Sequence, residues 1–104
     1  MERVGFTMRL LPGAEAEYRR RHAAVWPEML DALRAAGARE YSIFLDGDRL
    51  FAYLIVDDFS AFRAAMEAAE VNDRWQAEMA SLIDPQTDPA TGFHRRLEEV
   101  FHLD

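Results

Sequence analysis

The sequence predicts an α+β domain whose elements follow the order β-α-β-β-α-β, with the second helical region broken in two. Three observations predict this order. Residues 4–10 alternate between apolar and other side chains, as a half-buried strand does. Residues 14–26 place aromatic and apolar side chains at helical spacing. Two further alternating segments flank Asp46-Gly47-Asp48, a sequence with the chemistry of a hairpin turn.

The first strand and the first helical region follow directly from these patterns. Alternate side chains of a strand share one face, and here that face carries Val4, Phe6, Met8 and Leu10. Pro12-Gly13 then supplies a turn. In the helix that follows, one stripe carries Ala14, Tyr18, His22 and Trp26. Pro27 either kinks this helix or opens a new one at its first position, and Gly37 is a natural C-cap.

A β-hairpin is predicted next. Its first strand alternates over residues 41–45, with Tyr41 at the start of the inward-facing series, and its second strand covers residues 50–56. The second helical region is expected to begin at Ser60 as N-cap, with Phe59 as a hydrophobic staple.

The remaining elements complete the predicted order. The first helix of the second region covers residues 61–69. Asn72 is expected to cap a further helix that carries Trp75. Residues 84–92 contain two prolines and read as a surface loop, and residues 97–103 are predicted to form the last strand.

This order is that of the ferredoxin-like split βαβ fold, in which helices cover one face of an antiparallel sheet. We expect a single domain over residues 1–104. The other sheet face needs cover, either from a second copy of the chain or as a ligand pocket. Proteins of this pattern often do both, so we expect a homodimeric α/β barrel whose subunits each keep a cavity between sheet and helices.

Composition excludes several kinds of chemistry. The chain has no cysteine, and all 12 basic residues are arginine, so thiolate and lysine Schiff-base catalysis are ruled out. A formal charge of −7 argues against nucleic-acid binding. Neither a bilayer-spanning run nor a signal peptide is recognisable, so we expect a cytoplasmic protein without membrane contact. No metal-ligand spacing or glycine-rich phosphate loop occurs, and we assign no metal or cofactor.

Tyr18 and His22 are the main candidate functional residues. Four residues apart on a helix, they stack on one face with Cβ atoms about 5 to 6 Å apart. Histidine donates and accepts protons near neutrality, and tyrosine offers a phenol hydroxyl. The alternative is that both residues simply border the core. Trp75 is either a core tryptophan or a platform for the C–H face of a sugar, beside the amide of Gln76.

Four segments resemble the L-rhamnose mutarotase family over almost the entire chain. They are Glu17-Tyr18 with Arg20-Arg21-His22 and Trp26-Pro27-Glu28, residues 41–46, Arg74-Trp75, and residues 97–103. The resemblance implies a homodimer without metal or cofactor that interconverts the anomers of a deoxy-hexose. It implies that His22 is the proton donor and that Tyr18, Tyr41 and Trp75 contact the sugar. Gln76 replaces the second of two adjacent tryptophans, which leaves the exact sugar open.

Opening a hemiacetal ring requires a proton for the ring oxygen and removal of another from the anomeric hydroxyl, which is general acid and base work. We hypothesise that His22 is the acid and that Tyr18 orients the sugar. Asp46, Glu28 or a water remain alternatives for the base. Two other functions share this architecture: a small oxygenase or haem-binding protein with His22 as an axial ligand, and a non-catalytic sugar-binding dimer.

Overall fold

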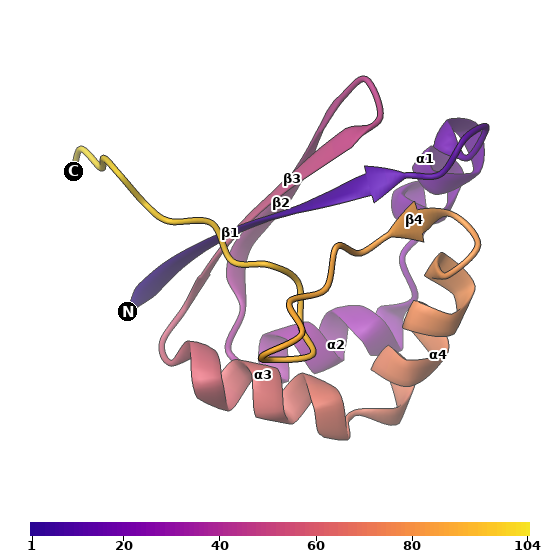
Figure 1. The fold of residues 1–104 in the computed structure, drawn as a ribbon. Coiled ribbons are helices and arrows are strands. Elements are labelled where there is room, and N and C mark those ends of the chain that lie inside the picture. The colour runs from indigo at the N-terminus through magenta and orange to yellow at the C-terminus, as the bar shows by residue number, and fades with distance from the viewer.

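The computed structural model describes residues 1–104 as one four-stranded antiparallel sheet with helices packed against one of its faces (Figure 1). The elements in chain order are β1 Glu2–Leu10, α1 Glu15–Ala23, α2 Pro27–Ala35, β2 Arg39–Asp46, β3 Arg49–Val56, α3 Phe59–Ala68, α4 Glu70–Met79 and β4 Ile83–Asp84. The strand order across the sheet is β2-β3-β1-β4, which is the ferredoxin-like topology and confirms the predicted fold class. No helix is long and apolar enough to cross a membrane.

The core lies between the sheet and the helices. In β1 from Val4 onward and in β3 the even-numbered residues are buried, and cross-strand register places Val4 opposite Leu54 and Phe6 opposite Ala52. Because side chains alternate along a strand, this register puts one continuous apolar surface under the helices. The helices contribute the buried side chains Tyr18, Met29, Phe62, Met66, Trp75 and Met79 to the same cluster.

The predicted hairpin is confirmed as β2 and β3. Asp46 is opposite Arg49, and the turn between them contains Gly47 at φ +64°, a conformation that glycine adopts without strain. The register of β2 shifts between Arg39 and Ser42, and within this irregularity Glu40 has φ +47°. Such a bulge re-aims side chains, and Tyr41 directly follows Glu40.

The last strand differs from the prediction. Residues 97–103 contain no regular structure, and the fourth strand is instead Ile83–Asp84, which pairs with the end of β1. On the edge of β1 away from β3, the main-chain contacts of its early part are the isolated bridge between Phe6 and Arg96 and a hydrogen bond from the Leu97 amide to the Gly5 carbonyl. The apolar pattern of residues 97–103 was misleading because no strand of this chain pairs with them.

The helix boundaries also correct the prediction in two places. Asp58, not Ser60, caps α3 by accepting a hydrogen bond from the Ala61 amide at 3.1 Å, and Phe59 is the first helical residue. Helix α4 begins at Glu70, so Asn72 lies inside it and does not cap it. Of the two alternatives predicted at Pro27, the structure confirms the second, because α1 ends at Ala23 and Pro27 opens α2 at its first turn.

Candidate functional site

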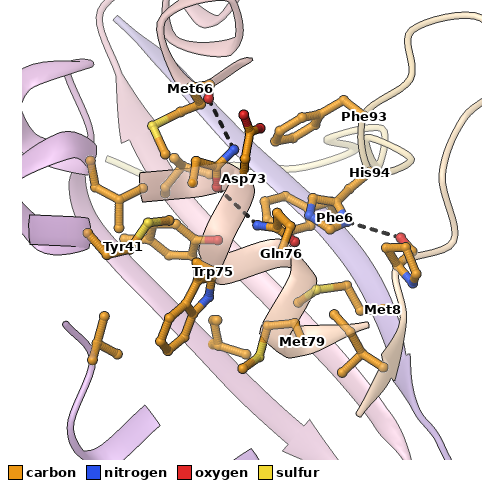
Figure 2. A pocket seen from close by; sticks show the side chains of 18 of the residues that line it. Phe6, Met8, Tyr41, Met66, Asp73, Trp75, Gln76, Met79, Phe93 and His94 are labelled. Atoms are coloured by element: carbon orange, nitrogen blue, oxygen red, sulfur yellow. Dashed lines mark hydrogen bonds between the residues drawn. The ribbon is translucent and has the colours of Figure 1, made fainter. Parts of the chain in front are cut away.

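A cavity of about 620 Å³ lies between the sheet and the helices (Figure 2). It is lined mainly by apolar side chains, 16 of 25 residues, with a few polar groups among them. Its size lies in the range of small-molecule sites. All five candidate site residues from the sequence line this one cavity; they are Tyr18, His22, Tyr41, Trp75 and Gln76.

Tyr18 and His22 lie against each other on α1, with ring centroids 4.0 Å apart and planes at 24°. His22 Nδ1 is 3.0 Å from the Tyr18 carbonyl oxygen, and because a carbonyl can only accept, Nδ1 is the donor. This bond holds the proton on Nδ1 in both charge states. His22 therefore gains and loses its exchangeable proton at Nε2.

Burial sets the protonation of this pair. Desolvation lowers the pKa of His22, opposed in part by its bond to the Tyr18 carbonyl. Burial also raises the pKa of the Tyr18 phenol to about 12. At neutral pH the Tyr18 phenol therefore keeps its proton. The His22 imidazole is neutral in most molecules and can accept or release a proton.

Trp75 joins the core and the cavity. It is 6% exposed, and its ring meets His22 edge to face at 5.4 Å. Trp26 packs on it from the other side at 5.1 Å and 85°, and the Arg74 guanidinium lies 5.8 Å from the Trp26 ring. Trp75 is thus a buried core residue that also lines the cavity, and its role as a sugar platform stays a prediction.

Tyr41 and Gln76 reach the cavity from different elements. Tyr41, on β2, packs edge to face against Phe6 with centroids 6.3 Å apart. Desolvation in the cavity raises the pKa of its hydroxyl, and the nearby Tyr18 adds to this. Gln76 is exposed at the cavity edge on α4, where its amide donates to Asn72 Oδ1 at 3.1 Å. Asn72 in turn donates to the Met66 carbonyl, as Figure 2 shows.

The proposed carboxylate bases lie elsewhere. Asp46 is at the hairpin end of β2, and Glu28 pairs with Arg74 at 3.1 Å on the surface. Neither carboxylate lines the cavity. Two other carboxylates do, Glu67 on α3 and Asp73 on α4, but both are exposed to solvent.

The sequence analysis missed His94 as a residue of this cavity. It lies in the loop after β4, and its ring stacks on Phe6 at 4.5 Å and 7°. Its Nδ1 donates to the Pro85 carbonyl at 3.0 Å, and desolvation lowers its pKa. A histidine next to Phe93 in an irregular loop carries no periodic signal, so nothing in the local pattern indicated this position.

No three His, Cys, Asp or Glu side chains gather closely enough to hold a metal ion. The titratable groups that line the cavity are two phenols, two imidazoles and two carboxylates. Phenols and neutral imidazoles in a mostly apolar cavity suit proton transfer to and from a small neutral ligand. The arrangement therefore favours acid and base chemistry on a compact polar molecule with an apolar part.

Comparison with known proteins agrees with this chemistry. The family model described as L-rhamnose mutarotase matches residues 3–103. A protein named L-rhamnose mutarotase from Burkholderia orbicola is 45% identical over 105 residues, covering 100% of both chains, and one from Listeria monocytogenes is 44% identical over 107 residues, covering 99% of each. The crystal structure of an L-rhamnose mutarotase from Formosa agariphila matches with a TM-score of 0.81 at 33% identity, covering 100% of both chains.

Proposed function

This chain belongs to the L-rhamnose mutarotase family, and we propose that it interconverts the α and β anomers of L-rhamnose within the cavity between sheet and helices. The observation that carries the proposal is the stacked pair of Tyr18 and His22 in a cavity large enough to admit a monosaccharide. A mutarotase is an isomerase that neither oxidises nor reduces its substrate. Groups that exchange protons therefore suffice for the reaction.

The reaction requires two proton transfers, one at each of the two oxygens bonded to the anomeric carbon. Protonated His22 gives its Nε2 proton to the ring oxygen while the bond between that oxygen and the anomeric carbon breaks. A base takes the proton of the anomeric hydroxyl, and the anomeric carbon becomes an aldehyde. Rotation about the bond to the next carbon and the reverse transfers then close the ring as the other anomer. Each positioned group contributes roughly 10² to 10⁴ in rate.

The remaining candidate residues bind the sugar in this proposal. The indole of Trp75 meets the C–H face of the ring, and the protonated phenols of Tyr18 and Tyr41 hydrogen-bond its hydroxyls. Gln76 adds an amide at the mouth of the cavity. The predominantly apolar lining suits a deoxy-hexose, whose methyl group replaces a hydroxymethyl group.

Exchange NMR on equilibrated L-rhamnose tests this function. Saturation of the α anomeric signal should transfer to the β signal much faster with protein than without it, and a heat-denatured sample serves as the control. Quenching of tryptophan fluorescence by L-rhamnose without faster exchange would mean that the protein binds the sugar but does not catalyse. L-Fucose, L-lyxose and D-glucose in the same assay define the sugar range.

We also propose that the chain forms a homodimer through the sheet face turned away from the helices. Large apolar side chains are exposed along this face and along the C-terminal segment, which crosses beside β1 (Figure 1). They are Phe44, Phe51, Tyr53, Leu97, Val100 and Phe101. An apolar patch of this kind marks an association surface.

Light scattering after gel filtration tests the dimer. We expect twice the 12.0 kDa mass of the chain, and Phe44→Glu should shift the protein toward the monomer because a charge would then be buried in the interface. A monomeric mass for the wild-type protein would exclude the dimer.

A cytoplasmic location is proposed as well, and fractionation of cells that produce the protein tests it.

A further inference from the structure

We propose that His94 is the second proton-transfer residue of this reaction, taking the proton of the anomeric hydroxyl while His22 protonates the ring oxygen. The inference rests on the proposed function. It fills a specific gap, because the reaction needs a base and the carboxylates suggested by the sequence, Asp46 and Glu28, do not line the cavity.

His94 is held so that one ring nitrogen remains available. Its Nδ1 donates to the Pro85 carbonyl at 3.0 Å, and its ring lies flat on Phe6 at 4.5 Å. A main-chain bridge between Thr87 and His94 fixes the loop beneath it. The side chain has no other hydrogen bond, so the Nε2 lone pair is free to accept a proton from a ligand in the cavity.

Both imidazoles belong to one aromatic wall. His22 stacks on Tyr18, and Tyr18 is near enough to Tyr41 to raise the pKa of its hydroxyl. Tyr41 packs against Phe6, on which His94 stacks. Both imidazoles therefore line the same cavity along a connected set of aromatic rings. The proposal requires that a bound sugar brings the two oxygens of its anomeric carbon within reach of the two imidazoles.

The other titratable groups of the cavity suit the role less well. Burial raises the pKa values of both phenols, Tyr18 and Tyr41, so both keep their protons at neutral pH and neither is a phenolate base. The Glu67 side chain is 62% exposed with Arg63 at 3.9 Å, and Asp73 on α4 is exposed too. Both carboxylates therefore face solvent at the edge of the cavity. His94 is half-buried among Phe6, Phe93 and Pro85.

The decisive variant is His94→Asn. The asparagine side-chain amide can replace the Nδ1–H donor toward the Pro85 carbonyl but offers no basic nitrogen in place of Nε2. We expect kcat/KM for anomer exchange of L-rhamnose to fall about 10² to 10³-fold. The wild-type profile of kcat/KM against pH should be bell-shaped, because one imidazole must be protonated and the other neutral, and the variant should lose one limb of that bell.

His102→Asn is the matched control. His102 lies in the exposed C-terminal segment, bonds only to Asp104 at 3.1 Å and does not line the cavity, so activity should stay at the wild-type level. If His94→Asn keeps activity within about threefold, or keeps both limbs of the bell, the proposal is wrong. A wild-type protein without any exchange activity would instead refute the proposed function itself.

A measurement on the unaltered protein makes the test independent of how the variant folds. Nitrogen-15 NMR of the histidine rings reports which nitrogen carries the proton. We expect the Nδ1–H form for neutral His94, with Nε2 shifting when L-rhamnose is added. An Nε2–H form, or an Nε2 signal that the sugar leaves unchanged, would overturn the assignment.

Discussion

The two histidines of the cavity are held by the same local device on very different pieces of backbone. His22 lies on a regular helix and bonds to a carbonyl one turn earlier, whereas His94 lies in an irregular loop and bonds to Pro85 across it. Each imidazole stacks on an aromatic ring and donates through Nδ1. The difference is that Tyr18, the stacking and hydrogen-bond partner of His22, lies one turn away on the same helix, while Phe6, the stacking partner of His94, lies on the first strand. One site residue could therefore be found from spacing, and the other only from the fold.

Of the changes considered, His22→Ala should lower the activity most. We expect kcat/KM for L-rhamnose anomer exchange to fall about 10³ to 10⁴-fold, because the acid that protonates the ring oxygen is removed. The fold should persist, since the side chain is only half-buried and the lost ring contact is worth about 0.5 to 1.5 kcal/mol. Exchange NMR and thermal unfolding measure the two effects. Full activity in the folded variant would remove His22 from the mechanism.

The pH dependence of the wild-type enzyme tests whether His22 and His94 act together. Burial lowers the pKa values of both His22 and His94 from 6.5. The state in which one imidazole is protonated and the other is neutral is therefore most populated below that pH. As pH rises through the higher of the two pKa values, the last imidazolium is lost. We expect kcat/KM, corrected for the uncatalysed rate, to fall about tenfold per pH unit on that side. A rate that keeps rising above pH 7 would show that neither histidine acts as the acid.

Much of the fold could be predicted because its signals are local. The alternation in residues 4–10, the hairpin turn at Gly47 and the helix start at Pro27 depend on neighbours within a few residues. The last strand failed for the opposite reason. Residues 97–103 have a strand-like pattern, but β4 occupies the end of β1, and residues 83–84 that form it carry no strand signal by themselves.

The candidate site shows the same division. Tyr18 and His22 share a helix face, and their side-by-side placement follows from the geometry of one turn. For Tyr41, strand alternation predicted an inward-facing side chain, but its meeting with Trp75 in one cavity depends on the packing of α4 and β2 around the sheet, which only the family resemblance indicated. His94 reaches the cavity only because the loop after β4 folds back along Phe6, a contact between distant parts of the chain that no local pattern encodes.

Trp75→Phe alters the cavity only on the wall formed by the helices and leaves the loop that carries His94 unchanged. The smaller ring keeps an apolar face but loses part of the surface beside His22, so we expect KM to rise about five- to tenfold with kcat within about twofold. Trp26→Phe is the matched control, because Trp26 packs on Trp75 without lining the cavity. Equal KM values for the two variants would argue that Trp75 is a core residue only. Isothermal titration with L-rhamnose gives an independent measure of binding.

Gln76→Trp should have the smallest effect and act on specificity alone. Gln76 is exposed at the cavity mouth, where its amide donates a hydrogen bond to Asn72. It makes no hydrogen bond to His22 or His94. An indole there would add apolar surface next to Trp75, and L-rhamnose carries a methyl group that L-lyxose lacks. Burying one such group is worth about 0.8 kcal/mol, so the preference for L-rhamnose over L-lyxose in kcat/KM should grow by up to about fourfold.

The reason to expect a change in preference without a change in chemistry is positional. The proposed proton-transfer groups His22 and His94 lie on α1 and on the loop after β4, whereas residue 76 is on the exposed side of α4. Gln76→Ala removes the amide without adding apolar surface, so it should leave the sugar preference unchanged and raise KM about twofold. If both variants instead shifted the pH profile, the mouth and the two imidazoles would not be independent, and the division of the cavity into a binding edge and a proton-transfer wall would fail.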